Sequence, residues 1–411
     1  MFSGLNVTLL VSGSIACYKS AELLRELQRR GSKVQVAMSS GAQAFVTPLT
    51  FQTLSGFPVV TELFDNHLEH EIGHIALADK ADIIICAPAS ANVLAKVSHG
   101  IADDIISTVV LASRSPVLFV PAMNVNMWQS KVTQDNVSRI RELGHFVLEP
   151  AEGPLACGWI GAGRFPELEI IIDTINFVLK AKDLRGTRVV VSAGPTTEKL
   201  DPIRYLSNVS TGKMGYAIAR VARWLGAEVT LVTGPTNIAP PIGVKVIQVE
   251  SADEMAKAMQ EECSRKVSKD IKLQLVYMAA AVSDHRPDKY STSKIKKDKD
   301  ASYDITFSPC PDILAGLGNS RKEIEKKSGV RLILVGFTAE TGKVEDLIKT
   351  ARDKREKKKC DMIVGNLAEE SFGLDSARVW LIPSSGKEEE LAVQDKHIIA
   401  DRLIKSTLKL V

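Results

Sequence analysis

Short apolar runs alternate with segments of helical periodicity along the first half of the chain. The runs predict strands at residues 7–11, 33–38, 82–86 and 117–120. Helices are predicted between the first two strands, at residues 16–30, and at the end of this half, at residues 169–179. β-Branched runs separated by helices indicate βαβ units and a parallel sheet covered by helices on both faces.

The same alternation restarts after a polar connection at residues 181–188. Further strands are predicted at residues 189–192, 228–232, 273–278, 331–335 and 361–364. We therefore expect an α/β protein of two doubly wound, Rossmann-like domains, residues 1–183 and 184–411, with ligands at the carboxyl ends of the strands.

Composition adds constraints without changing this picture. The 411 residues are 45% hydrophobic and 25% charged, as in an ordinary globular protein. Lys and Arg number 52 and Asp and Glu 49, so the net charge of 52 − 49 = +3 gives no bulk attraction to nucleic acid or to a membrane. Sites for anions must be local.

Cysteine usage and the N-terminal residues predict a cytoplasmic protein. The six cysteines are scattered without a C-x-x-C pair, which fits a reducing compartment. The apolar N-terminal residues have no basic residue before Lys19, and no apolar run approaches about 18 residues. We expect neither a signal peptide nor a transmembrane helix.

Small polar residues follow the first two predicted strands. Gly13 and Ser14 open the first helix, and the next strand ends at Ser39. Free backbone N–H groups, hydroxyls and the positive end of a helix dipole suit a phosphate. The competing interpretation is a pair of tight turns with helix caps.

Three further features of the first half favour chemistry on a bound ligand. His74 has a titration range that suits proton transfer, although a lone histidine is more often structural. Asn124 follows a strand, where it either orients a carboxylate or forms a turn. Residues 155–164 are too glycine-rich for regular structure, and we interpret them as a mobile flap that carries Cys157.

These motifs together resemble the flavin-dependent cysteine decarboxylases, specifically the phosphopantothenoylcysteine decarboxylases. The resemblance covers residues 1–179 and rests on G-S-I-A-x-Y-K, the histidine before A-P-A-S-A-N, P-A-M-N-x-x-M-W and A-C-G-x-x-G-x-G-R. It implies a flavodoxin-like flavoprotein domain with His74 as catalytic histidine, Asn124 on the substrate carboxylate and Cys157 as proton donor. The implied FMN contacts are Gly13, Ser14, Ser39, Ser107 and Thr108.

The chemistry explains why a flavin is needed. The carboxylate of a cysteine cannot leave as carbon dioxide without an electron sink, so the flavin first oxidises the thiol to a thioaldehyde. After decarboxylation the enethiolate takes hydride back from the reduced flavin. A proton from an acid, for which Cys157 is the candidate, completes a cycle without net redox change.

The second half has a loose likeness to a dinucleotide-binding fingerprint. Gly212 and Gly215 precede small residues that permit close packing of a helix on a sheet, but the spacing is not G-x-G-x-x-G. An acidic residue for a ribose is not evident after the second strand of this half. An NAD(P) oxidoreductase is therefore the runner-up for this domain.

The second half more closely resembles phosphopantothenate–cysteine ligases from residue 186 to the end. The motifs are S-N-x-S-T-G-K-M-G, A-A-V-x-D, K-I-K-K and G-F-x-A-E-T. The resemblance implies a nucleotide-binding ligase domain that uses CTP with Mg²⁺, Lys294 on the phosphates, and Asn208 on the acyl-cytidylate until cysteine displaces CMP. The implied CTP contacts are Ala279, Asp284, Lys294, Cys310, Pro311, Asp312, Ile313, Phe337, Lys354 and Lys358.

The whole chain is thus similar to the bifunctional decarboxylase and ligase family of coenzyme A biosynthesis. Cys310 replaces the usual asparagine and His285 the usual aromatic residue, so the preference for CTP over ATP is open. The family implies a homo-oligomer with trimeric decarboxylase and dimeric ligase parts. The alternative for the first domain is an FMN-binding carrier without activity.

Overall fold

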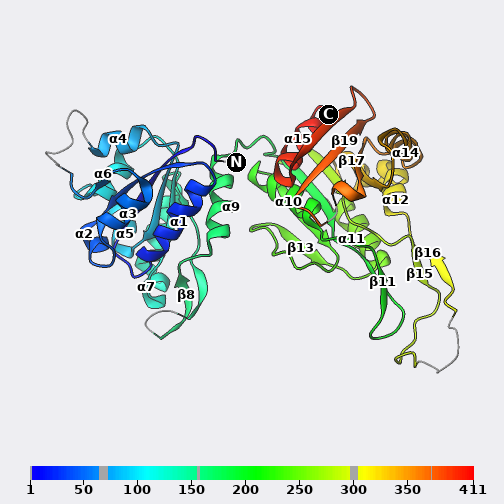
Figure 1. Cartoon of the computed structure of the whole chain (residues 1–411), viewed down its shortest axis with the longest axis horizontal. Coiled ribbons are helices and arrows are strands. Elements are labelled where there is room, and N and C mark those ends of the chain that lie inside the picture. The colour runs from blue at the N-terminus through cyan, green and yellow to red at the C-terminus, as the bar shows by residue number, and fades with distance from the viewer. Residues whose placement is uncertain (1, 64–72, 155–157, 297–303, 372) are drawn as a thin grey trace. The chain divides into compact units, whose positions relative to one another are not determined.

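The computed structural model describes residues 2–63, 73–154, 158–296, 304–371 and 373–411. The chain divides into two compact units, Met1–Lys180 and Ala181–Val411, each with its own sheet. Figure 1 shows the two sheets in their separate parts of the chain. Within the described ranges, no helix combines the length and apolar character needed to cross a membrane.

The first unit is built on a six-stranded parallel sheet in the order β3-β2-β1-β4-β5-β6. Its strands consist largely of buried Val, Ile, Leu and Ala, as expected when helices cover both faces. The strands are β1 (Asn6–Val11), β2 (Lys33–Met38), β3 (Val59–Val60), β4 (Ile83–Ala89), β5 (Val117–Pro121) and β6 (Phe146–Val147).

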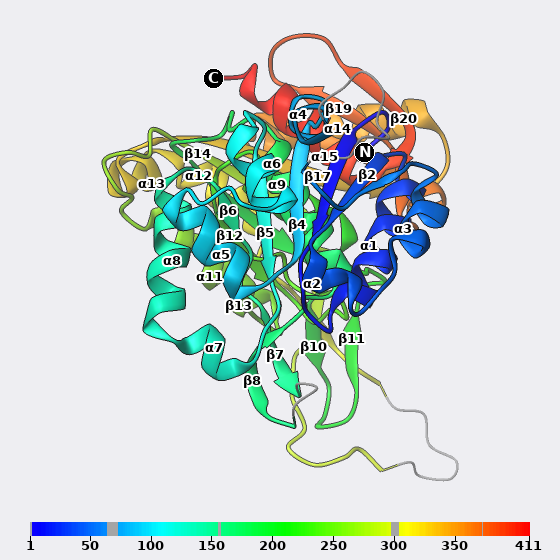
Figure 2. The same ribbon diagram turned by 90° about the vertical axis from the view of Figure 1, so that its left-hand side faces the viewer.

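Helices pack on both faces of this sheet, with α1 and α3 to one side and α5 and α8 to the other in Figure 2. One apolar cluster joins Leu23 and Phe51 to the sheet, and a second joins Leu94 and Ile140 to its other face. The helices are α1 (Cys17–Arg29), α2 (Ser40–Gln43), α3 (Pro48–Ser55), α4 (Gly73–Asp79), α5 (Ala91–His99), α6 (Ile105–Ala112), α7 (Val125–Gln129), α8 (Lys131–Glu142) and α9 (Leu168–Leu179).

The glycine-rich segment is more regular than the sequence predicted. Strands β7 (Ala151–Pro154) and β8 (Ile160–Arg164) pair as an antiparallel ribbon, so the expectation of irregular structure throughout residues 155–164 is wrong. A glycine is needed at position 163 because two backbone segments come close together there. A Cβ on Gly163 would lie 2.3 Å from the carbonyl oxygen of Met123. Cys157 lies outside the described residues.

The second unit has an eight-stranded sheet in the order β13-β12-β9-β14-β17-β18-β19-β20. The first six strands in that order are parallel, and the last two are antiparallel additions that the sequence analysis did not anticipate. The strands are β9 (Thr187–Ala193), β12 (Glu228–Thr233), β13 (Lys245–Gln248), β14 (Leu273–Met278), β17 (Arg331–Glu340), β18 (Met362–Leu367), β19 (Ser376–Pro383) and β20 (Glu389–Asp395).

Helices and two short ribbons complete this unit. The ribbons pair β10 (Thr197–Lys199) with β11 (Tyr205–Ser207), and β15 (His285–Pro287) with β16 (Phe307–Pro309), and both extend away from the sheet in Figure 1. The helices are α10 (Lys213–Trp224), α11 (Ala252–Ser264), α12 (Ile313–Asn319), α13 (Arg321–Ser328), α14 (Val344–Lys357), α15 (Lys396–Leu408) and the 3₁₀ turn η1 (Ala368–Glu370). The α/β fold class is therefore confirmed in both units.

Candidate functional site

The first unit has a cavity of about 500 Å³ next to the carboxyl ends of β1 and β5. Three residues singled out from the sequence, Gly13, Ser14 and Asn124, line it together. Tyr18, Lys19, Met127 and Arg164 also line the cavity and were not named as site residues. The sequence could have indicated Lys19 and Arg164 as site residues, because they are the last residues of the motifs G-S-I-A-x-Y-K and A-C-G-x-x-G-x-G-R.

The turn after β1 is held against two neighbouring loops. The Ser14 hydroxyl donates to the carbonyl oxygen of Ala122 at 3.1 Å. A Cβ on Gly13 would lie 3.1 Å from the carbonyl carbon of Gly41, so the two loops that follow β1 and β2 are in contact. Ser39 caps α2 in the second of these loops, where its Oγ accepts the N–H of Ala42 at 3.2 Å. The small residues thus form a compact cradle.

Ser107 and Thr108, the other two implied FMN contacts, lie on α6 and do not line this cavity. The Ser107 hydroxyl donates to the carboxylate of Asp104 at 2.9 Å as part of a capping box. The Thr108 Oγ1 is buried and has no hydrogen-bond partner among the described residues. A buried hydroxyl without a partner is costly unless another group satisfies it.

Asn124 lines the cavity of the first unit, whereas His74 does not. His74 lies on α4, its Nδ1 is buried, and that nitrogen has no hydrogen-bond partner in the described part of the chain. Asn124 is the N-cap of α7, and its Oδ1 accepts the N–H of Asn126 at 2.8 Å. His74 does not line the cavity that Asn124 faces, so the two remain separate candidates.

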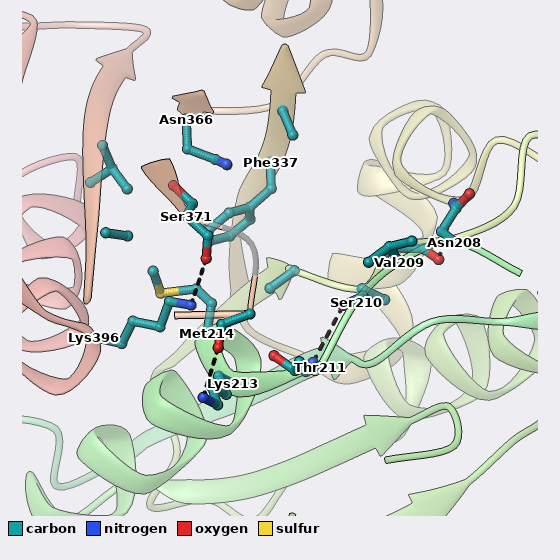
Figure 3. Close-up of a pocket in the computed structure, with 18 of the residues that line it drawn as sticks. Asn208, Val209, Ser210, Thr211, Lys213, Met214, Phe337, Asn366, Ser371 and Lys396 are labelled. Atoms are coloured by element: carbon teal, nitrogen blue, oxygen red, sulfur yellow. Dashed lines mark hydrogen bonds between the residues drawn. The ribbon is translucent and has the colours of Figure 1, made fainter. Parts of the chain in front are cut away.

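The second unit has a cavity of about 490 Å³ lined by the segment that follows β14 and by residues of the neighbouring strands β17, β18 and β19. Asn208, Ala279 and Phe337, predicted from the sequence, all line it, and Figure 3 shows Asn208 and Phe337 with other lining residues. The Asn208 amide donates to the carbonyl oxygen of Val282 at 2.9 Å, which fixes the side chain beside the segment that follows β14.

Two glycines bring the amino end of α10 to this cavity. Gly212, the N-cap, has a φ of +77°, a conformation that side chains rarely adopt. A Cβ on Gly215 would lie 2.5 Å from the Cβ of Ala193, so the helix packs closely on the end of β9. The N–H groups at the start of α10 therefore lie beside a space in which an anion would be favoured.

The remaining implied CTP contacts, apart from Lys294, form a second group around α12. The Cys310 N–H donates to the carbonyl oxygen of Asp284 at 2.8 Å, and Asp312 caps α12. Lys358 lies 3.2 Å from the carboxylate of Asp312. Lys354 donates to Thr338 Oγ1 at 2.5 Å and to Glu340 at 3.1 Å. Thr338 lines the cavity, so it connects the two groups.

Burial, together with nearby carboxylates of which Glu198 is the first, raises the pKa of the Cys310 thiol to about 11. The thiol is therefore protonated at neutral pH and is a poor nucleophile. Cys310 is therefore suited to a contact through its backbone rather than to a reaction of its thiol.

Lys294 is exposed, and it does not line the cavity. Its neighbour Ile295 donates its N–H to the carboxylate of Asp201 at 3.1 Å, and Arg204 donates to the carbonyl oxygen of Ile295 at 3.1 Å. The lysine-rich segment is thus fastened beside β10 and β11. Lys297, the last residue of the K-I-K-K motif, lies outside the described residues.

No metal ligands can be assigned from the described side chains, because they include no group of three or more His, Cys, Asp or Glu residues that could hold a metal ion. The sequence analysis expects Mg²⁺ on the phosphates of the nucleotide, and Mg²⁺ bound in this way needs only one or two protein carboxylates.

Comparisons with known proteins match both halves of the chain. The Flavoprotein family model matches residues 1–180, and the model described as DNA/pantothenate metabolism flavoprotein C-terminal domain matches residues 184–410. The coenzyme A biosynthesis bifunctional protein CoaBC of Vibrio parahaemolyticus is 39% identical over 99% of both chains. That of Bacillus subtilis is 40% identical over 96% of this chain and 95% of its own. A crystal structure of the C-terminal domain of a CoaBC protein is 35% identical over 56% of this chain and 98% of that chain, with a TM-score of 0.43.

Proposed function

Because this chain belongs to the family of bifunctional coenzyme A biosynthesis proteins, we propose that residues 1–183 form a decarboxylase domain and residues 184–411 a ligase domain. The protein is a bifunctional enzyme of coenzyme A biosynthesis, a phosphopantothenate–cysteine ligase and an FMN-dependent phosphopantothenoylcysteine decarboxylase. The finer assignments below are supported by the two cavities.

The ligase joins 4′-phosphopantothenate to cysteine with CTP. The substrate carboxylate attacks the α-phosphate of CTP and displaces pyrophosphate, and the amine of cysteine then displaces CMP from the acyl-cytidylate. Attack of an anion on a triphosphate needs positive charge in the transition state. Lys294, Lys354 and Lys358 supply that charge in our proposal, with Mg²⁺ on the phosphates. Asn208, held beside the cavity by Val282, orients the acyl group.

The decarboxylase acts on the product of the ligase. The residues of its cavity fit a flavin phosphate, because a side chain on Gly13 would crowd Gly41 and Ser14 adds a hydroxyl. Bound FMN supplies the reversible oxidation of the cysteine thiol that makes loss of carbon dioxide possible.

The protein's own residues bind and protonate the substrate in this proposal. Asn124 holds the substrate carboxylate, and His74 is the catalytic histidine, whose buried Nδ1 has no partner within the described ranges. Cys157 donates the final proton to the enethiolate. The Thr108 hydroxyl, which is likewise buried without a partner in the part of the chain described here, is available to a bound cofactor.

Exposed apolar side chains support the proposed homo-oligomer. Ile15, Tyr18 and Phe45 are each more than half exposed, and all three line the first cavity. Tyr205 on β11 and Phe307 on β16 are exposed on the two ribbons of the second unit. Exposed apolar groups of this kind are typical of contact surfaces. We place the trimeric contacts at the first cavity and the dimeric contacts at the ribbons.

The observation that carries the proposal is that each unit has a cavity lined by residues predicted for its half-reaction. The test assays the halves separately on one preparation. Synthetic 4′-phosphopantothenoylcysteine should release carbon dioxide without CTP. Then 4′-phosphopantothenate and cysteine should release pyrophosphate only when CTP is added. A yellow protein that releases pyrophosphate but no carbon dioxide would leave the first domain as an FMN carrier.

A further inference from the structure

One end of the cavity in the second unit carries polar groups to which no role has been given above. They are Ser371 after η1 and Lys396, the first residue of α15, and the first turn of α10 lines the cavity with them. Figure 3 shows the Lys396 side chain reaching toward Ser371, with Met214 of α10 next to it, while Asn208 lies at the opposite side of the view. We call Ser371, Lys396 and the first turn of α10 the polar end of the cavity.

Lys396 places a buried ammonium group at the polar end. The residue is 7% exposed, and its Nζ donates to the carbonyl oxygens of Ser371 at 3.0 Å and Leu374 at 2.6 Å. An ammonium group has three hydrogens, so one remains for another acceptor. Both acceptors are neutral, and within the described ranges no carboxylate forms an ion pair with this lysine. A buried charge is costly without an ionic partner, so the position favours an anion in the cavity.

The charges around Lys396 point the same way. Burial lowers its pKa, the charge of Lys213 lowers it further, and Asp375 offsets part of this effect. An anion bound next to the ammonium group would favour its charged form.

Ser371 offers a hydroxyl that the described residues leave unsatisfied. The residue is 7% exposed, and its Oγ is buried without a hydrogen-bond partner. Its carbonyl oxygen, in contrast, is already an acceptor for Lys396. Buried hydroxyls in proteins are nearly always paired, so this one indicates a group that arrives with a ligand.

The first turn of α10 adds backbone donors. The helix has 12 residues, and its N-cap Gly212 has no side chain to cap the free N–H groups. These groups and the positive end of the helix dipole favour an anion. Lys213 is already paired, because its Nζ lies 2.7 Å from the carboxylate of Asp375 and donates to the carbonyl oxygen of Gly373 at 2.9 Å. Lys396 is therefore the cation of the polar end that is left for the anion.

Two ligands of the proposed ligase carry phosphate groups. Our proposal places the triphosphate of CTP at Lys294, Lys354 and Lys358, and the acyl group of 4′-phosphopantothenate at Asn208. The 4′-phosphate stands at the opposite end of that substrate from its carboxylate. Asn208 lines the same cavity as the polar end, and the volume of about 490 Å³ is in the range of small-molecule sites. A substrate held at Asn208 can therefore extend its phosphate to the polar end.

We propose that the polar end binds the 4′-phosphate of 4′-phosphopantothenate. This inference rests on the proposed ligase function. A phosphate monoester carries a charge of about −1.5 to −2 at neutral pH and has three acceptor oxygens. It accepts the Ser371 hydroxyl, the third hydrogen of Lys396 and N–H groups of α10 at once. The polar end thus recognises the acyl substrate by its phosphate, apart from the lysines that serve the nucleotide.

The test compares Ser371→Ala and Lys396→Met with matched controls on α15, Ser406→Ala and Lys405→Met. Lys405 is exposed and pairs with Asp401, and the Ser406 hydroxyl bonds the carboxylate of Glu389. For each protein, pyrophosphate release gives kcat and the separate KM values for 4′-phosphopantothenate and CTP. Ser371→Ala should raise the KM for 4′-phosphopantothenate about tenfold and leave kcat and the KM for CTP nearly unchanged, because the lost bond holds the substrate throughout the reaction.

The outcomes separate this inference from the proposed function. An unchanged KM for 4′-phosphopantothenate in Ser371→Ala would overturn the phosphate subsite and leave the ligase function standing. A rise in the KM for CTP alone would overturn it as well and assign the polar end to the nucleotide. If the unaltered protein releases no pyrophosphate with any nucleotide, the proposed ligase function fails and this inference falls with it.

Lys396→Met should raise the same KM further, about a hundredfold, because it removes a charged donor. This variant also loses two bonds to the backbone, so it can weaken the fold. Ser371→Ala removes only the unpaired hydroxyl and therefore decides the question.

Discussion

The carboxylate of Asp201 accepts the backbone N–H of Ile295 at 3.1 Å, across a separation of 94 residues in the chain. The same carboxylate accepts the N–H groups of Ile203 and Arg204, each at 2.8 Å. One buried side chain therefore fixes the loop between β10 and β11 and also the residue next to Lys294. This contact holds the backbone beside the exposed Lys294 in a defined place, as the proposed role of that lysine requires.

Asp201→Ala should reduce ligation by roughly tenfold to a hundredfold, because displacement of the segment that carries Lys294 moves its charge away from the phosphates. Pyrophosphate release measures the effect, and carbon dioxide release from synthetic 4′-phosphopantothenoylcysteine should not change. Asp270→Ala, at an exposed position in the same unit, is the control. Equal ligation rates in the two variants would refute the anchoring role.

Asp201 should also make stability depend on acid pH. Burial alone would raise its pKa, but the three backbone N–H groups and Arg204 outweigh burial and lower it from the ordinary value of 3.8. A carboxyl whose pKa is lower in the folded state stabilises the protein above its unfolded pKa, and this contribution is lost as the pH falls through the folded pKa. The difference in urea midpoint between the unaltered protein and Asp201→Ala should therefore be constant near pH 7 and shrink below about pH 4. A difference independent of pH down to about pH 3 would contradict this assignment.

Lys294→Gln should slow acyl-cytidylate formation by about a hundredfold or more, the scale on which single electrostatic stabilisers act. Lys296→Gln removes a second exposed lysine of the same segment and serves as its control. Pyrophosphate release in a single turnover measures the step directly. If both variants behave alike and lose little, the segment is a solvated run of charge.

His74→Asn should abolish decarboxylation while the protein stays folded and yellow, because the expected flavin contacts lie elsewhere. The visible absorbance of bound flavin and the release of carbon dioxide are measured on one sample. His99→Asn changes an exposed histidine at the end of α5 and should retain activity. Loss of flavin from His74→Asn would instead identify a structural histidine.

Cys157→Ser should still oxidise and decarboxylate its substrate but stall before the product, because a serine hydroxyl is a far weaker acid than a thiol. The oxidised enethiol should accumulate and be detectable by mass spectrometry. Normal turnover of this variant to 4′-phosphopantetheine would remove Cys157 from the mechanism.

The sequence predicted the strands well where burial alone determines them. Residues 33–38 and 273–278 were predicted with the bounds that β2 and β14 have, because each is a buried apolar run ended by polar or small residues. The ribbon of β7 and β8 was missed because its many glycines predicted irregular structure. In the structure Gly163 lies so close to the backbone of Met123 that only a glycine fits. Glycine content alone does not distinguish a loop from a closely packed strand.

The site was predicted only as far as local motifs extend. Gly13 directly follows the parallel strand β1, so its place at a cavity follows from the topology. Asn208 follows the short ribbon strand β11, and it was found only through the motif S-N-x-S-T-G-K-M-G. Lys396 could not be found in this way, because it reaches the cavity only when α15 packs back beside α10. Ser107 was predicted as an FMN contact from its motif, but in the structure its hydroxyl is already bonded to Asp104 in the cap of α6.

The most direct test of the account is to incubate the purified protein with 4′-phosphopantothenate, cysteine, CTP and Mg²⁺ and to quantify three products together. We expect 4′-phosphopantetheine, carbon dioxide and pyrophosphate in equal amounts. None of the three should form when CTP is omitted, and omission of cysteine should leave only the single-turnover pyrophosphate of acyl-cytidylate formation. Pyrophosphate without 4′-phosphopantetheine, or no CTP-dependent product at all from a folded, flavin-loaded protein, would contradict the claim that one chain performs both reactions.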